Sequence, residues 1–140
     1  MKKLIALLAV AVVALSAVAI ATAGSRTQVM LGAKLDAMQD NAKSKGTGTF
    51  TATVTGKKLS WKLTFTHLTG AATAAHIHLG AKGKAGNVLV ALCGPCKAGQ
   101  SGTVPMSAAV LKDVKKGVTY VNVHTAKNPN GEIRGQVAAH

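Results

Sequence analysis

The order of apolar and polar residues along most of the chain has a period of two, which is typical of half-buried β-strands. Short runs rich in Val, Thr and aromatic residues are separated by clusters of Gly, Asn and Lys, which favour turns. The pattern predicts about seven strands, over residues 28–36, 49–56, 59–68, 73–80, 87–92, 118–125 and 132–138.

The alternation is clearest in the two neighbouring segments 49–56 and 59–68. Every second residue is apolar from Phe50 to Val54 and again from Leu59 to Phe65, with Thr, Ser and Lys between them. Residues 56–58 predict a hairpin turn, and Asn128-Pro129-Asn130-Gly131 predicts another near the C-terminus. Each strand is therefore expected to turn one face to a core and the other away from it.

One segment departs from the strand pattern and predicts a short helix over residues 107–116. Ser107 suits the N-cap, lysines fall in the last turn, and Gly117 suits the position after the end. Val110, Leu111 and Val114 form a narrow apolar stripe, which would lie across a sheet edge. Together the elements predict an all-β fold class, an antiparallel β-sandwich with one short helix.

The N-terminal residues have the three-part form of a secretory signal peptide. Two lysines precede an apolar run over residues 4–21, and Ala21-Thr22-Ala23 offers a small-residue cleavage site. We therefore expect a signal peptide over 1–23 and a single mature domain over 24–140, secreted or held in the periplasm or cell envelope, with no transmembrane segment after cleavage. The alternative is an uncleaved membrane anchor, since the run is nearly long enough to span a bilayer.

Charge narrows the class of partner. The chain carries 17 Lys and Arg against 4 Asp and Glu, and the expected mature chain has a net charge of about +11. Such a charge suits an anionic envelope polymer or an extracellular protein as partner, but the lysines are scattered along the chain, so a solvated basic surface is the preferred interpretation. No nucleic-acid partner is expected, because with 3% aromatic residues the chain has too few rings to stack bases.

Cys93-Gly94-Pro95-Cys96 has the spacing of a thioredoxin active site, but its surroundings do not suit that chemistry. A redox pair of this kind sits at a helix N-terminus, whereas residues 97–102 are rich in Gly and cannot easily form a helix. The chain also lacks the alternating strands and helices of such enzymes. In an exported protein, paired thiols in a loop predict a structural disulfide between Cys93 and Cys96.

Three histidines are predicted to project from the same side of the sheet. His76 and His78 are two residues apart on one strand, opposite the apolar Ala75 and Ile77, so both rings should point outward. His124 should also point outward, because it alternates with valines. If their strands are neighbours, the three imidazoles meet and form a site suited to copper(II) or zinc(II). The alternative is that these rings bond loop backbone and tie down strand ends.

The other titratable groups are expected to have smaller roles. Glu132 could add a carboxylate to the histidine cluster across the hairpin, whereas His67 is expected to face inward at a strand end as a structural residue. His140 is terminal. The four acidic residues are too dispersed for a glycosidase pair, and no nucleophile elbow of a serine hydrolase is present.

Three blocks of sequence in this order resemble a chordin-type (CHRD) domain. They are Ala75-His76-Ile77-His78-Leu79-Gly80, Tyr120-Val121-Asn122-Val123-His124-Thr125 and Asn128-Pro129-Asn130-Gly131-Glu132-Ile133-Arg134-Gly135. The resemblance covers nearly all of the expected mature chain and is to the exported, stand-alone bacterial type. It implies a Greek-key β-sandwich like that of immunoglobulin domains or copper–zinc superoxide dismutase. It also gives the turn residues 128–131 and Arg134 a structural role.

The resemblance leaves three functions to compare. The first is a non-enzymatic binding or structural module, since in chordin such domains belong to a protein that sequesters growth factors. The second is a copper or zinc protein using His76, His78 and His124, the positions that match the dismutase His-x-His strand and a distant histidine. The third, a dismutase-like or Cys-x-x-Cys-dependent enzyme, is disfavoured because the bridging histidine and zinc-loop ligands of dismutases are missing.

Overall fold

The computed structural model describes residues 27–37 and 42–140, so the expected signal peptide lies outside the described residues. Helix α1 covers Ala108–Lys115. The strands are β1 (Gln28–Asp36), β2 (Thr47–Thr55), β3 (Lys58–Thr66), β4 (Ala72–Leu79), β5 (Val88–Cys93), β6 (Gln100–Pro105), β7 (Thr119–Thr125), β8 (Ile133–Gln136) and β9 (Ala138–Ala139).

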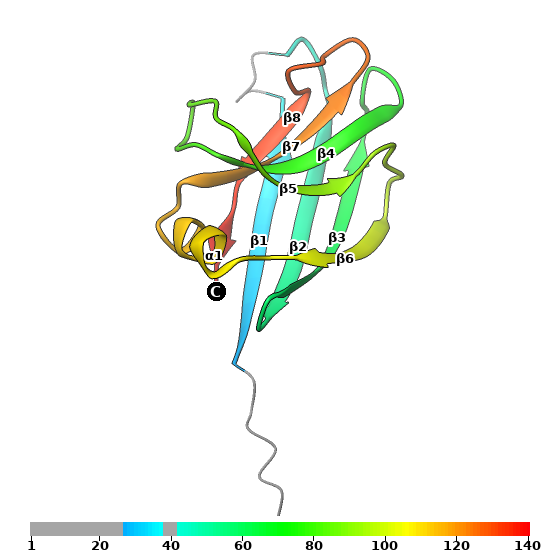
Figure 1. Cartoon of the computed structure of the whole chain (residues 1–140). Helices are drawn as coiled ribbons and strands as arrows, with labels where there is room; N and C mark the ends of the chain where they lie inside the picture. Colours follow the sequence, from blue (N-terminus) through cyan, green and yellow to red (C-terminus); the bar gives the residue numbers. More distant parts are fainter. Residues whose placement is uncertain (1–26, 38–41) are drawn as a thin grey trace, which may run out of the picture.

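The strands form one antiparallel sheet that folds over into two layers (Figure 1). One layer holds β1, β2, β3 and β6, and the other holds β8, β7, β4 and β5. The layers join where β8 and β9 both pair with β1, for example at Asp36 and Arg134. The end strands β5 and β6 also contact each other, so the sheet is nearly closed into a barrel. The predicted all-β class is confirmed.

The connections between the layers are those of a Greek key. Strand β6 returns to pair with β3 and not with β5, and β7 returns to pair with β4 and not with β6. This topology makes β4 and β7 neighbours although more than forty residues separate His76 from His124. It therefore creates the neighbourhood that the histidine hypothesis requires.

The predicted alternation sets the core between the layers. Phe50 and Leu63 are fully buried opposite each other on β2 and β3, and Ile77 and Val121 are fully buried opposite each other on β4 and β7. The two-residue turn between β2 and β3 begins with Gly56, whose φ of 61° suits a residue without a side chain. The hairpin is thus fixed both by its apolar face and by its turn.

The helix was predicted closely, and one strand was missed. The Ser107 side chain accepts a hydrogen bond from the Val110 amide at 3.2 Å, as its N-cap role requires, and Gly117 follows the helix with a φ of 71°. Strand β6 was not among the predicted strands, because its sequence, Gln100–Pro105, lacks an apolar period, and β8 and β9 were predicted as one strand. No helix among the described residues is long and apolar enough to cross a membrane.

Candidate metal centre

The histidine cluster lies on the face of the β4–β7 pair that points away from the core. His76 and His78 alternate with Ala75 and Ile77, both fully buried, and therefore project to the opposite side. His124 projects to that same side from β7, where its neighbours in the sequence include the buried Val123. The predicted strand parity is thus correct for all three rings.

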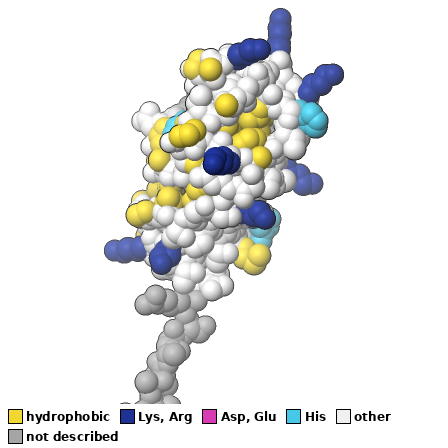
Figure 2. All heavy atoms as spheres, turned by 90° about the vertical axis from the view of Figure 1, so that its right-hand side faces the viewer, with side chains coloured by type: hydrophobic (Ala, Val, Ile, Leu, Met, Phe, Trp, Pro, Cys, Tyr) yellow, Lys and Arg dark blue, Asp and Glu magenta, His cyan; other side chains and the backbone are white. Residues whose placement is uncertain are grey.

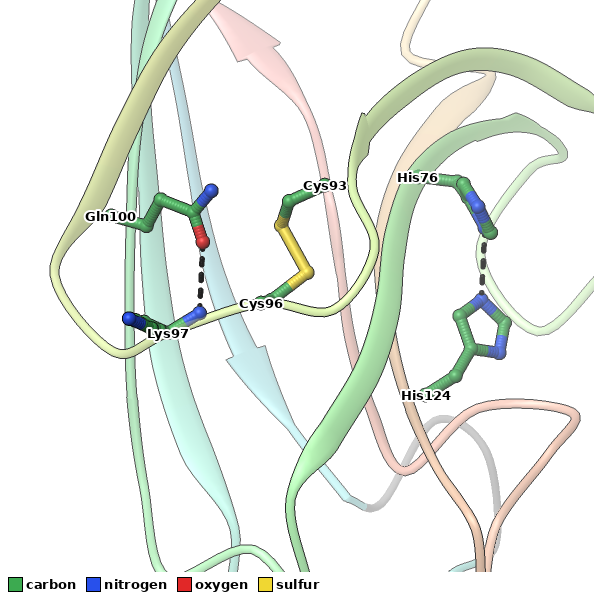
Figure 3. The surroundings of a disulfide bond; sticks show 6 residues. All are labelled: His76, Cys93, Cys96, Lys97, Gln100 and His124. Carbon is green, nitrogen blue, oxygen red and sulfur yellow. Dashed lines mark hydrogen bonds between the residues drawn. A yellow bond between two sulfur atoms is a disulfide. The ribbon is translucent and has the colours of Figure 1, made fainter.

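The three rings approach one another closely. Nδ1 of His76 lies 3.3 Å from Nε2 of His124, as Figure 3 shows. The ring of His78 is 5.6 Å from that of His76 and 5.7 Å from that of His124, measured between centroids. One ring nitrogen from each residue lies within 4.8 Å of the other two.

Backbone carbonyl groups fix the tautomers of two of these rings. Nδ1 of His78 donates to the carbonyl oxygen of Gly86 at 3.0 Å, and Nδ1 of His124 donates to that of Pro129 at 3.0 Å. A ring that donates from Nδ1 carries its lone pair on Nε2 when neutral. Both rings are therefore held with the lone pair on Nε2, which is how an outer-shell carbonyl orients a metal-ligating histidine. Nε2 of His124 accepts a hydrogen bond from Nδ1 of His76 at 3.3 Å, so an ion bound by both nitrogens would replace that proton.

The expectation that all three rings face solvent is wrong for His78. Its side chain is only 9% exposed, because the connection between β4 and β5 folds back over it. Within the part of the chain that the structure describes, Nε2 of His78 is buried without a hydrogen-bond partner. A buried acceptor of this kind is costly unless something occupies its lone pair.

Tyr120 and Arg134 support His78 from the side. The Tyr120 ring stacks on that of His78 at 5.0 Å and 11°, and the Arg134 guanidinium lies 3.4 Å above the Tyr120 ring. Arg134 also donates to the carbonyl oxygen of Lys84 at 3.1 Å, and Tyr120 accepts from the Gly86 amide at 3.3 Å. The stack therefore positions both His78 and the loop that covers it. Tyr120, expected to point outward, is buried under this loop.

Burial and mutual repulsion favour the neutral forms of His76 and His124 by lowering the pKa of each. Desolvation lowers the pKa of His76, and the neighbouring His124 and His78 lower it further. Desolvation also lowers the pKa of His124, whereas the hydrogen bond to the Pro129 carbonyl oxygen acts to raise it. A neutral imidazole is the form that binds metal, so the lowered pKa values make His76 and His124 available to a metal ion at a lower pH than free histidine.

The geometry suits one transition-metal ion. Two ligands of a tetrahedral ion lie about 3.3 Å apart when metal–nitrogen bonds are near 2.0 Å, which matches the distance between His76 and His124. The ring nitrogens of the other two pairs lie within 4.8 Å of each other, so each pair would have to approach by at most about 1.5 Å to reach the same separation. Three neutral imidazoles are a ligand set that both copper and zinc accept.

Glu132 does not join this cluster, which corrects the prediction of a fourth ligand. Its side chain is fully buried, and both carboxylate oxygens accept hydrogen bonds from other residues. The donors are Ser44 at 2.6 Å, Thr69 through its amide at 2.6 Å and its hydroxyl at 2.7 Å, Thr125 at 2.6 Å and Asn128 at 3.0 Å. Burial acts to raise the pKa of this carboxyl, but these bonds together lower it to about 2.

The turn Asn128-Pro129-Asn130-Gly131 connects the carboxylate of Glu132 to the cluster. Asn128 donates to Glu132, Pro129 accepts from His124, and Asn130 accepts from the Asn122 side chain at 3.0 Å. Gly131 closes the turn on Asn128 at 3.1 Å. The turn residues therefore hold the acceptor that orients His124.

The other candidate residues fall outside the centre. Cys93 and Cys96 form the predicted disulfide, with sulfur atoms 2.12 Å apart, in the connection from β5 to β6 (Figure 3). The expectation that His67 faces inward is wrong, because β3 ends at Thr66 and His67 turns out to solvent with a φ of 56°. His140 is exposed, and its amide donates to Met30 at 2.9 Å beside β1.

Sequence reasoning missed the residues that support the ligands. The sequence predicts no role for the connection of residues 80–86, yet Gly86 supplies the acceptor for His78. A Cβ atom at Gly86 would lie 1.9 Å from the carbonyl oxygen of Leu79, so this close approach needs glycine. The signal in the sequence was a glycine-rich connection directly after His-x-His.

The fold and the histidine cluster together define a Greek-key β-sandwich domain with a candidate metal centre on the outside of one layer. The CHRD domain family matches residues 31–137. The chain therefore belongs to the CHRD-domain family. No curated protein and no solved structure matches it.

Proposed function

We propose that this protein is an exported, non-enzymatic binding module that holds copper(II) or zinc(II) through His76, His78 and His124. Membership of the CHRD-domain family supports a binding or structural role. The disulfide is consistent with an oxidising compartment. The alternative role of the three rings, bonding loop backbone alone, accounts for Nδ1 of His78 and His124 but leaves Nε2 of His78 without a function.

The observation that carries the proposal is the arrangement of two oriented Nε2 atoms around a third imidazole. A histidine that only ties down a loop needs one hydrogen bond to the loop backbone. His78 and His124 each make that bond through Nδ1. One ring nitrogen from each of the three histidines nevertheless lies within 4.8 Å of the other two. Among the described residues, no carboxylate belongs to this group. Among divalent ions, copper(II) is expected to bind most tightly to such nitrogen ligands. Zinc(II) also accepts imidazole ligands and is the second candidate.

Copper titration of the purified mature protein tests this directly. We expect one equivalent of copper to bind to the wild type and binding to be lost in the His76→Ala/His78→Ala variant. The matched control is His67→Ala/His140→Ala, which removes two exposed imidazoles outside the cluster and should bind as the wild type does. Equal binding by both variants would exclude the centre.

Export is proposed separately, from the signal-peptide form of residues 1–23. Expression of the full chain in a bacterial host followed by mass spectrometry of the product tests it. We expect a mature N-terminus at Gly24 and recovery outside the cytoplasm. Recovery of the chain beginning at Met1 in the membrane fraction would favour the uncleaved anchor.

A further inference from the structure

The outer face of the β1–β2–β3–β6 layer carries an ordered array of hydroxyl groups that the metal centre does not use. Strand β2 alternates without interruption between core residues and threonines, so five threonine side chains project outward in one row. They are Thr47, Thr49, Thr51, Thr53 and Thr55. The cluster of histidines lies on the other layer, so this face is a separate surface.

The strand register extends this row sideways. Thr49 lies opposite Thr64 on β3 and Thr47 lies opposite Thr66, with hydroxyl oxygens 2.6 Å and 3.3 Å apart. One strand further, Ser60 lies opposite Thr103 on β6, with hydroxyls 3.5 Å apart. The result is a sheet face covered by hydroxyl groups in regular rows.

Three lysines stand within these rows. Lys34 pairs with Thr49 across β1 and β2, Lys62 pairs with Thr51, and Lys58 pairs with Thr55. All three are exposed. Among the described residues, the one acid on this face is Asp36, at the end of β1 where it pairs with Arg134. Figure 2 views the molecule from the right-hand side of Figure 1. Dark-blue basic side chains project from that side, and no acidic side chain is visible there.

The face is also hollowed along β2. Three open hollows of about 340, 420 and 470 Å³ follow one another along the strand. The first two share Lys34 and Thr49, and the last two share Gly32 and Thr51, so they form one continuous groove. Gly32 has no side chain, and the His140 ring occupies the space beside it and lines both of the hollows that share this residue.

We propose that this face binds a linear anionic polysaccharide, with sugar hydroxyls on the threonine row and acidic groups on three lysines. Lys34 and Lys62 line the groove, and Lys58 lies beyond its end, opposite Thr55. Lys58 and Lys62 are four residues apart on one strand, roughly 13 Å, so a polymer with repeated charges can reach both without bending. The groove matches the extended shape of such a polymer, the threonine hydroxyls match its sugar hydroxyls, and the lysines match its acidic groups.

A protein or nucleic-acid partner fits this face less well. Protein interfaces depend on buried aromatic and large apolar residues, and the one large hydrophobic side chain exposed here is Met30, at 62%. Single-stranded nucleic acids need aromatic platforms for their bases, and no exposed Phe, Tyr or Trp side chain lies on the described part of this face.

Binding of polygalacturonate, dextran sulfate and neutral dextran to the mature protein tests the proposal. We expect both anionic polymers to bind, more weakly as salt rises, and neutral dextran not to bind. Lys34→Gln/Lys58→Gln/Lys62→Gln should weaken binding about tenfold, since three exposed charge pairs are lost. The matched control, Lys82→Gln/Lys84→Gln/Lys127→Gln, removes equal charge elsewhere and should change binding less than about twofold.

A second variant separates the groove from net charge. Thr49→Val/Thr51→Val keeps every charge and the shape of the strand but removes two hydroxyls from the middle of the groove. We expect it to bind dextran sulfate several-fold more weakly with the same salt dependence. Equal losses in the two lysine variants, or wild-type affinity in the threonine variant, would overturn the proposal. Copper binding should be unchanged throughout, because this surface is independent of the metal centre.

Discussion

At the scale of single residues, the buried side chain of Glu132 is held by hydrogen bonds from several directions. Ser44, Thr69 and Asn128, each in a different connection, and Thr125 at the end of β7 donate to its two oxygens. A buried carboxylate is tolerated only when such bonds replace water. Its contribution is therefore to hold Ser44, Thr69 and Asn128 together at one end of the sandwich, next to the turn that orients His124.

Replacing this carboxylate should change both stability and its pH dependence. The pKa of Glu132 is lowered to about 2, so the unfolded chain binds more protons than the folded chain between about pH 2 and 4.5. The stabilisation is present above pH 4.5 and is lost as the pH falls through this window. Glu132→Gln should lower the free energy of unfolding at pH 7 by roughly 3 kcal/mol.

Urea unfolding of the wild type and Glu132→Gln from pH 2 to 7 measures this difference. We expect the two curves to converge gradually as the pH falls from about 4.5 to about 2, where the folded wild-type carboxyl becomes protonated and loses its charge. A difference that stays constant with pH would mean that shape and not charge sets the contribution of Glu132.

Residue positions could be predicted from the sequence where strand parity alone decides them. The sides on which His76, His78 and His124 project follow from alternation with apolar neighbours. Their exposure does not, because it depends on which connection folds over them. His78 and Tyr120 both point away from the core, and both are buried under residues 80–87.

At the scale of elements, the β4–β5 connection acts as the support of the metal centre. It is held by Arg134 at Lys84 and by Tyr120 at Gly86, and it passes so close to Leu79 that a side chain at Gly86 has no room. Because this connection supplies the acceptor for His78, its path determines which nitrogen of that ring is free.

Gly86→Ala should therefore weaken copper binding although residue 86 is not a ligand. The added Cβ displaces the connection from Leu79 and removes the acceptor that orients His78. Loss of such a partner typically costs about tenfold or more in metal affinity. Lys82→Ala, in the same connection and exposed, is the control and should bind as the wild type does. Unchanged affinity in Gly86→Ala would remove the supporting role.

The disulfide belongs to a different connection and should be separable from metal binding. It closes a loop of four residues between β5 and β6, and so short a loop stabilises the fold by about 2 kcal/mol. Cys93→Ser/Cys96→Ser should lose about this free energy in urea unfolding and keep wild-type copper affinity. A loss of copper binding in this variant would show that the cysteines belong to the site.

Elements were predictable where the local pattern was strong. The hairpin of β2 and β3 and helix α1 have both an apolar pattern and suitable turn or cap residues. Strand β6 has neither, since Gln100–Pro105 alternates half-buried and exposed residues and Val104 is the one residue of the strand whose apolar side chain packs against the core. It becomes a strand because the edge of β3 offers it a partner, which is a long-range contact that local sequence does not encode.

At the scale of the whole molecule, the two layers divide the proposed functions. The metal centre lies outside β4 and β7, and the hydroxyl-rich groove lies outside β1, β2 and β3. The core between them is shared, so each surface can be altered without direct contact with the other. The two proposals can therefore be tested independently in one protein.

Metal binding should stabilise the whole molecule through mass action. The three ligands come from two adjacent strands of one layer, so the ion does not lock the layers together, and its effect depends only on how much better the folded chain binds it than the unfolded chain. At copper concentrations of about 100 times the dissociation constant, the stabilisation is about 2.7 kcal/mol, equivalent to roughly 10 °C in Tm. Calorimetry should show this shift in the wild type and in His67→Ala/His140→Ala, and none in His76→Ala/His78→Ala. If the wild type bound copper without a rise in Tm, the unfolded chain would have to bind the ion equally well, and the preorganised rings of His78 and His124 would then give no advantage.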